Sequence, residues 1–347
     1  MISAAMPDKQ RLPWLDSARG IAILLVVLGH IGQGATPLRQ WVYAFHIPLF
    51  FILTGILLRL RPDRLDQPFG CFVRHRARQL LYPYLTFSAV VMVYVLLRHG
   101  VSACGRVLIY TLTLEGHTTL WFLPACLLAE CLFFAIRRSR FRDFPCFLLL
   151  ALGSGLYAAA QFHVLGGGEP AAAGPLFGML NFFCRAAIGS VFVYAGYALY
   201  PRLTRRIDAL PRCAQVLSST GIMVVCAFAA QLNGLVDLHY CVLNHAVLYY
   251  PLALAGSFSL ILLLRSLDCH CAMLVFFGRN SLTVMATHYA LPIVNFAIWC
   301  VSFLSAGQHV ASDLLALLIV MALEAGVIGL INRLLPWMLA PPKSAGR

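Results

Sequence analysis

Apolar residues in this chain gather into long runs separated by short polar segments. A helix needs about 20 mostly apolar residues to cross a bilayer. The runs therefore predict an all-α, polytopic transmembrane bundle. The expected spans are 20–38, 43–58, 81–97, 119–136, 144–162, 179–200, 214–232, 242–264, 281–303 and 311–335. A further run, 101–114, is too short to span and indicates an interfacial or re-entrant segment.

The composition excludes an ordinary soluble domain. Hydrophobic side chains make up 61% of the 347 residues and charged ones 11%, whereas soluble domains carry about 25% charged residues. No low-complexity stretch or clear internal repeat divides the chain. We therefore expect one transmembrane domain over residues 1–340 and a short cytoplasmic tail over 341–347.

The net charge of +13 is distributed unevenly along the chain. Basic residues lie between the apolar runs and form no basic face interleaved with aromatic residues, so nucleic acid is not an expected partner. With a cytoplasmic N-terminus, about 22 of the 26 Lys and Arg residues fall on inner segments. Arg39, Arg98 and Arg106 fall in outer loops, and Arg185 lies inside a span. This asymmetry predicts that both termini are cytoplasmic.

A metal site is not expected. Cys269 and Cys271 flank His270, but this group has no second cluster of ligands to complete a zinc site.

Ionisable side chains inside the expected spans are candidate functional residues, because each costs at least a few kcal/mol in a bilayer. Arg19 and His30 belong to the first span. Eleven helical positions make three turns and about 20°, so both side chains share one face and lie about 16 Å apart along the axis. Arg19 alone is typical of a positive-inside anchor, and His30 alone of a packing histidine. Together they indicate acyl transfer, which needs a base that titrates near neutral pH and a cation for an anionic donor.

Further polar groups lie in or beside the apolar runs. His46 opens the second span, so a short hairpin returns it towards His30. A basic inner loop from Arg74 to Arg78 is suited to hold phosphates, although topogenic charge also explains any one of its arginines. The remaining candidates are Trp121, Glu130, Asn280 and His288.

Four ordered motifs resemble the membrane acyltransferase-3 family, and the resemblance covers nearly the whole chain. They are Leu15-Asp16 with Arg19-Gly20-Ile21-Ala22 and His30; Phe45-His46-Ile47-Pro48-Leu49-Phe50-Phe51; Trp121-Phe122-Leu123-Pro124; and Gly278-Arg279-Asn280-Ser281-Leu282 with Thr287-His288-Tyr289. The first is similar to the first-helix signature of the family, and the others are similar to its fucose 4-O-acetylase-like branch. Thr54 stands where the family often has Ser before Gly, and the Arg74–Arg78 stretch matches the family's basic loop loosely.

The resemblance implies a multi-pass enzyme of the bacterial inner membrane. It would move an acyl group, usually acetyl, from cytoplasmic acyl-coenzyme A to a sugar hydroxyl of a surface polysaccharide or lipid-linked glycan. The expected co-substrate is acetyl-coenzyme A, and the expected partners are the lipid bilayer and a carbohydrate acceptor.

The resemblance also assigns roles to residues of this chain. His30 would be the catalytic histidine, with Arg19 binding the donor or holding the site, and Arg74 and Arg78 near the coenzyme A phosphates. Independently of the resemblance, His46 is preferred to His288 for orienting the acceptor or the catalytic imidazole, because the short hairpin places it near His30. The residues expected on the substrate side are Trp121, Glu130, Asn280 and His288.

The residues leave alternatives open. His30 is either acylated first or acts as a general base. Intramembrane His, Arg and Glu also mark transport paths, so a transporter or flippase for a polar or lipid-linked solute is the alternative function. The lack of repeated or inverted halves in the sequence favours the enzyme. An acyl-binding membrane module without transfer of its own is a third interpretation.

Overall fold

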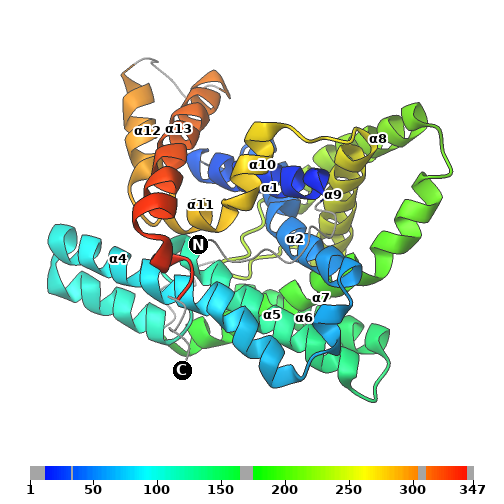
Figure 1. Cartoon of the computed structure of the whole chain (residues 1–347), viewed down its shortest axis with the longest axis horizontal. Coiled ribbons are helices and arrows are strands. Elements are labelled where there is room, and N and C mark those ends of the chain that lie inside the picture. The colour runs from blue at the N-terminus through cyan, green and yellow to red at the C-terminus, as the bar shows by residue number, and fades with distance from the viewer. Residues whose placement is uncertain (1–11, 33, 165–174, 304–309, 342–347) are drawn as a thin grey trace.

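The computed structural model describes residues 12–32, 34–164, 175–303 and 310–341, which fold into a bundle of α-helices (Figure 1). Residues 342–347 of the predicted tail lie outside this range. In chain order the elements are α1 (Pro13–Ile31), α2 (Pro37–Leu60), α3 (Asp63–Asp66), α4 (Phe69–Leu112), the 3-10 turn η1 (Thr118–Trp121), α5 (Phe122–Arg138), α6 (Asp143–Val164), α7 (Pro175–Ile207), α8 (Arg212–Asn233), α9 (Ala246–Ser266), α10 (Ala272–Arg279), α11 (Ser281–Thr287), α12 (Ile293–Ser302), α13 (Val310–Leu334) and η3 (Pro336–Met338).

The prediction of an all-α membrane bundle is confirmed. Within the described residues, nine helices are long and apolar enough to cross a membrane, and each overlaps one predicted span. The prediction of one span over 281–303 is wrong, because α11 and α12 are two short helices joined by a turn at His288–Pro292. Pro292 accounts for the break, since proline donates no backbone hydrogen bond and disfavours a helical conformation in the residue before it.

Helix α4 is a hairpin of two unequal limbs. Gly100 has φ 82° and ψ −178°, a conformation that favours glycine, and the chain reverses direction there (Figure 1). The second limb, Val101–Leu112, is the segment that the sequence marked as interfacial or re-entrant. The Tyr84 hydroxyl donates to the Thr111 carbonyl at 2.9 Å and ties the end of this limb to the middle of the first.

Glycines allow the helix that carries Arg19 and His30 to pack closely on α10. A Cβ added at Gly20 would overlap the carbonyl oxygen of Leu274, and one at Gly278 would overlap that of Asp16. Small residues permit such backbone approach between membrane helices, where packing rather than the hydrophobic effect drives association. Helix α1 is thereby fixed against the segment that leads to His288.

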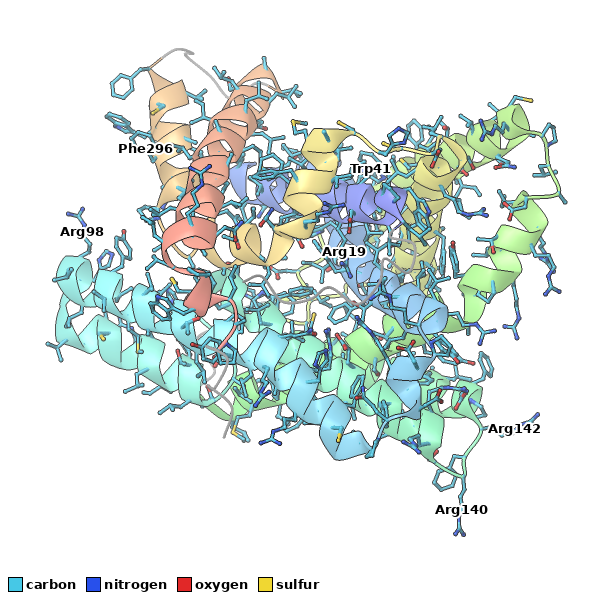
Figure 2. The ribbon with its side chains drawn as sticks, viewed as in Figure 1. Arg19, Trp41, Arg98, Arg140, Arg142 and Phe296 are labelled. Carbon is cyan, nitrogen blue, oxygen red and sulfur yellow. The ribbon has the colours of Figure 1, made fainter. Side chains whose placement is uncertain are left out.

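The basic segments meet at one end of the bundle, which we call the basic end, defined by Arg59, Arg137, Arg138 and Arg265. The guanidinium carbons of Arg59 and Arg137 lie 5.2 and 5.0 Å from the Tyr197 ring centroid, and Arg138 donates to the Gln67 carbonyl at 2.8 Å. Arg140 and Arg142 lie at one extreme of the molecule and Arg98 at the other (Figure 2).

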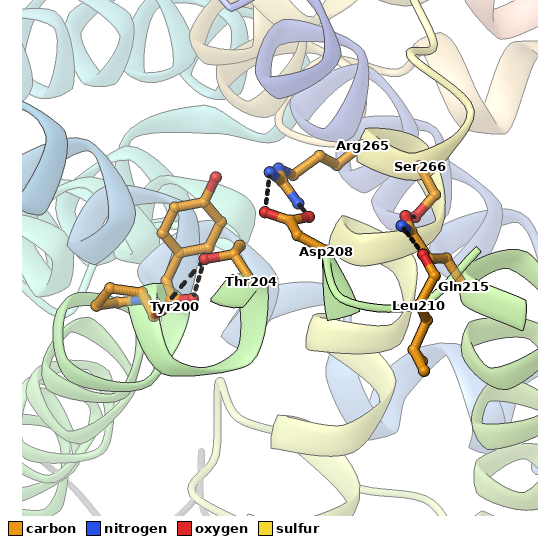
Figure 3. A network of polar contacts seen from close by, with 8 residues as sticks. Tyr200, Thr204, Asp208, Leu210, Gln215, Arg265 and Ser266 are labelled. Atoms are coloured by element: carbon orange, nitrogen blue, oxygen red, sulfur yellow. Dashed lines mark hydrogen bonds and ion pairs between the residues drawn. The ribbon is translucent and has the colours of Figure 1, made fainter. Parts of the chain in front are cut away.

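One ion pair at the basic end holds the α7–α8 connection against α9. Arg265 donates to both carboxylate oxygens of Asp208, with a distance of 2.8 Å to Oδ2 (Figure 3). These hydrogen bonds hold the pKa of Asp208 below its ordinary value. Ser266 adds a hydrogen bond of 2.9 Å to Gln215 in α8.

Candidate active site

His30 lies in the last turn of α1 and contacts two residues of the turn between α11 and α12. Its ring stacks on Tyr289, with ring centroids 4.4 Å apart and an interplanar angle of 24°. The centroid of the His288 ring lies 5.2 Å away. The break in the predicted span 281–303 therefore brings both side chains to His30.

His46 lies on α2 and lines the same cavity as His30. Its Nδ1 is 2.8 Å from the Val42 carbonyl oxygen, one turn earlier. Because a carbonyl oxygen accepts, this contact assigns the proton to Nδ1 and leaves a lone pair on Nε2. The geometry therefore gives His46 the form of a fixed hydrogen-bond acceptor.

His288 has the same arrangement. Its Nδ1 is 2.6 Å from the Val284 carbonyl oxygen, and its side chain is fully buried. Within the described residues, its Nε2 has no hydrogen-bond partner. A buried nitrogen without a partner is costly, which marks His288 as a position held for more than packing.

The cavity beside His30 and His46 is small, with a volume of about 70 Å³, and His288 does not line it. It brings together residues from α1, α2, η1 and the α8–α9 connection. Its polar and aromatic lining includes His30, Tyr43, His46, Trp121, Asp237 and His239. Trp121, expected on the substrate side, thus lies beside the candidate catalytic histidine.

The α8–α9 connection supplies two lining residues that sequence reasoning did not single out. Asp237 and Val242 form an antiparallel bridge, and the Asp237 Oδ1 accepts from the His239 backbone N–H at 2.9 Å. His239 stacks on Trp121, with centroids 5.7 Å apart and planes 5° apart. Burial raises the pKa of Asp237 and, together with the charge of Arg185, lowers the pKa of His239 well below its ordinary value.

Arg185 supports Trp121 from α7. Its side chain is almost completely buried, its guanidinium carbon lies 5.2 Å from the Trp121 ring centroid, and it donates to the Glu115 carbonyl at 3.0 Å. Sequence reasoning noted Arg185 as the basic residue inside a span. In the structure, the Arg185 guanidinium packs on the Trp121 ring and stabilises this aromatic wall of the cavity by a cation–π contact.

Arg19 lies near the basic end in a cluster of charges rather than in the cavity. It is half-buried, and the charges that act on it belong to Asp16, Arg64, Arg76 and Glu130. Arg76 makes a two-pronged ion pair with Glu130, whose side chain is 3% exposed. Arg279 donates to Asp16 at 3.0 Å.

The basic stretch from Arg74 to Arg78 is helical, not a loop as the sequence suggested. It forms the second and third turns of α4. Arg74 and Arg78 are four residues apart and share an exposed face, whereas Arg76 points inward to Glu130. The side chains of Arg74 and Arg78 are therefore exposed at the basic end, whereas the Arg76 guanidinium is paired with Glu130.

Glu130 and Asn280, both expected on the substrate side, do not line the cavity. Glu130 pairs with Arg76, and Asn280 accepts from the Asn332 side chain at 3.0 Å and donates to the Phe276 carbonyl at 2.8 Å. In the part of the chain that the structure describes, no three His, Cys, Asp or Glu side chains are grouped to hold a metal ion.

Comparison with known proteins gives a family match. The model of the acyltransferase-3 family, described as an acyltransferase domain, matches residues 12–333. Part of the chain is similar to the nodulation protein NolL of Sinorhizobium fredii, with 34% identity over 124 residues. This match covers 32% of the chain and 33% of the relative, so the chain spans about a third of that protein's length. No solved structure matches the chain.

Proposed function

The chain belongs to the acyltransferase-3 family, and on this premise we propose that it transfers an acetyl group from acetyl-coenzyme A to a sugar hydroxyl of a surface polysaccharide or lipid-linked glycan. The family and the apolar helices make the protein a multi-pass membrane acyltransferase. The acetyl donor, the carbohydrate acceptor and a place in the bacterial inner membrane are parts of the proposal. Membership of the fucose 4-O-acetylase-like branch, which the motifs resemble, is also part of the proposal.

One observation carries the proposal: His30 lines a cavity between the two ends of the bundle, beside His46 and in contact with His288 and Tyr289. Acyl transfer to a hydroxyl needs a base at the reacting oxygen, held so that it meets the thioester carbonyl. His30 and His46 line this cavity and His288 packs on His30 from outside it, so together they supply the base and groups to orient it. A carrier would need a path wide enough for its solute, and the cavity of about 70 Å³ is narrow for that purpose.

The proposed reaction proceeds in one transfer. The acceptor hydroxyl oxygen forms a bond to the thioester carbonyl carbon, and the bond from that carbon to sulfur breaks. His30 takes the hydroxyl proton, and coenzyme A leaves as a thiolate that is then protonated. His46 Nε2 accepts a hydrogen bond from the acceptor hydroxyl or from the His30 ring and so sets the direction of attack.

The donor belongs at the basic end. Coenzyme A carries phosphates, and Arg74 and Arg78 are exposed there to bind them, while Arg19 lies between that surface and the cavity. The axial separation of about 16 Å between Arg19 and His30 leaves the pantetheine arm to carry the thioester inward. From the positive-inside rule we infer that the basic end faces the cytoplasm, where acyl-coenzyme A is made.

The proposal is tested with the full chain purified in lipid nanodiscs and given acetyl-coenzyme A. The expected result is release of free thiol that increases when glycolipids from the producing cells are added. Mass spectrometry of surface and lipid-linked glycans, from cells with and without the protein, should show acetyl groups that depend on it. A protein that moves a solute across vesicles but releases no thiol is a carrier, and the proposal would then be wrong.

A further inference from the structure

The cavity beside His30 cannot hold a sugar together with a thioester. Its volume of about 70 Å³ is enough for a few water molecules. If the acceptor is a carbohydrate, as proposed above, it has to bind in a neighbouring space and present one hydroxyl to His30.

A second, larger space lies next to this cavity, which we call the α4 groove. Its volume is about 530 Å³, within the range of small-molecule sites. The two limbs of α4 form one wall, and the turn between α11 and α12 forms the other. Its polar and aromatic lining includes Tyr94, His99, Arg106, Tyr110, Tyr289 and Asn295.

The α4 groove meets the cavity at two residues. Thr118 lines both spaces. Tyr289 lines the groove while its ring stacks on His30, 4.4 Å between centroids. The Tyr289 ring is therefore the partition between the groove and the candidate catalytic histidine.

The position of the groove separates it from the donor side. It lies at the Gly100 turn of α4, whereas the other end of the same helix begins beside Gln67, which Arg138 binds at the basic end. In Figure 2, Arg98, which precedes the turn, lies at one extreme of the molecule. Arg140 and Arg142, which follow α5, lie at the other. A molecule in the groove therefore approaches His30 from the side opposite the donor arginines.

The lining suits a sugar. Aromatic rings pack on the C–H faces of a sugar ring, and the groove offers those of Tyr94, Tyr110 and Tyr289. Asn295 is exposed, and both its amide N–H and its carbonyl oxygen can bind hydroxyl groups. Arg106 lines the groove, and among the described residues its one hydrogen bond is a long one, 3.4 Å to Ser102, which leaves most of its five N–H donors for a ligand.

We propose that the α4 groove binds the acceptor sugar and that one of the sugar hydroxyls reaches His30 past the Tyr289 ring. This proposal rests on the proposed function but adds a binding site and its residues. The class of ligand is a glycan, either free in a polysaccharide or attached to a lipid carrier.

A substitution that fills the groove tests the proposal. Ala103 lines the groove, and Ala103→Trp places a large ring in it. Val101→Trp is the matched control, because Val101 lies two positions away on the same limb, is 79% exposed and does not line the groove. Because Ala103→Trp can disturb packing, a second variant combines Arg106→Ala with Asn295→Ala, which changes two exposed residues.

Two measurements are made on every variant. Mass spectrometry counts acetyl groups on lipid-linked and on finished surface glycans, and calorimetry gives the Kd for acetyl-coenzyme A. We expect both groove variants to lose glycan acetylation by about tenfold or more, since a misplaced acceptor hydroxyl reacts far more slowly. The Kd for acetyl-coenzyme A should stay within about twofold of the wild-type value, and Val101→Trp should match wild type in both measurements. Acetyl groups on the lipid-linked fraction identify the carrier-bound glycan as the acceptor.

Wild-type acetylation by both groove variants would overturn the proposal, as would an equal loss of acetylation and donor binding in the double variant. Failure of the proposed function looks different: the wild-type protein then neither binds acetyl-coenzyme A nor changes any glycan.

Discussion

Tyr289 stacks on His30, with 4.4 Å between the ring centroids and 24° between the ring planes. The two residues come from opposite ends of the sequence, and the contact depends on the turn that separates α11 from α12. Tyr289 thus fixes the plane of the imidazole to which the acyl transfer is assigned.

Removal of this stack should slow transfer without weakening donor binding. We expect Tyr289→Ala to lower kcat by about tenfold to a hundredfold, because a displacement of the reacting group by about 1 Å has effects of that size. Tyr289→Phe keeps the ring and should retain most of the activity. A steady-state comparison of both variants checks this, and equal losses in the two would assign the role to the hydroxyl group instead of the stack.

His30→Ala should abolish transfer while the protein remains abundant in the membrane. Loss of a general base costs about 10²–10⁴ in rate, whereas one imidazole at the edge of a cavity contributes little to the bundle. His270→Ala is the control, since His270 is exposed and outside the cavity. Activity of His30→Ala within about threefold of wild type, far less than the usual loss, would falsify the assignment.

Arg19→Lys separates a binding role from a topology anchor. An anchor needs a positive charge, which Lys keeps, but binding or orientation depends on the planar fork of Arg, which Lys lacks. We therefore expect Arg19→Lys to insert normally, as judged by membrane abundance, and to lose most of its transfer activity. Full activity of this variant would leave Arg19 as an anchor alone.

Arg74 and Arg78 should affect the donor more than the chemistry. With both changed to Ala, the KM for acetyl-coenzyme A should rise by more than kcat falls, because the phosphates lose charge-assisted hydrogen bonds remote from the reacting atoms. Cysteines introduced beside Arg76 should react with a membrane-impermeant maleimide from the cytoplasmic side alone. Reaction from the outer side would reverse the proposed orientation and the donor route with it.

The ion pair between Arg76 and Glu130 should act on stability. Glu130→Gln leaves the Arg76 charge without its partner, which for a buried pair costs about 3–5 kcal/mol, so the thermal unfolding midpoint should fall. The double variant with Arg76→Gln should recover most of that loss. If Glu130 instead contacts substrate, as the sequence suggested, the double variant will regain stability but not the wild-type KM for the acceptor.

Hydropathy predicted the spans well because bilayer thickness sets a minimum length of apolar residues for every crossing helix. It failed at 281–303, where the apolar average hides the local effect of Pro292 on the backbone. The helical face shared by Arg74 and Arg78 follows from their spacing once the stretch is known to be helical. The sequence did not indicate that this stretch is helical, because its closely spaced charges hide the burial of Phe72 just before them.

The candidate site was accessible from sequence where its residues are close in the chain. A short hairpin brings His46 back towards His30, and both line one cavity. Asp237 and His239 reach that cavity, and Tyr289 reaches His30, through contacts between distant segments, and a single sequence contains no signal for such contacts. Asp237 and His239 in particular stand in a connection between spans, where polar residues are ordinary.

The Gly100 turn has a consequence for the thickness of the membrane barrier. The limb Val101–Leu112 extends about 18 Å at 1.5 Å per residue, well short of the hydrocarbon core of about 30 Å. The chain therefore turns into η1 within the depth of the bilayer, and its backbone there has to be shielded from lipid by protein or water. A limb of this length crosses little more than half of the core, so a water-filled α4 groove beside it would shorten the distance between the two aqueous compartments in the region of His30.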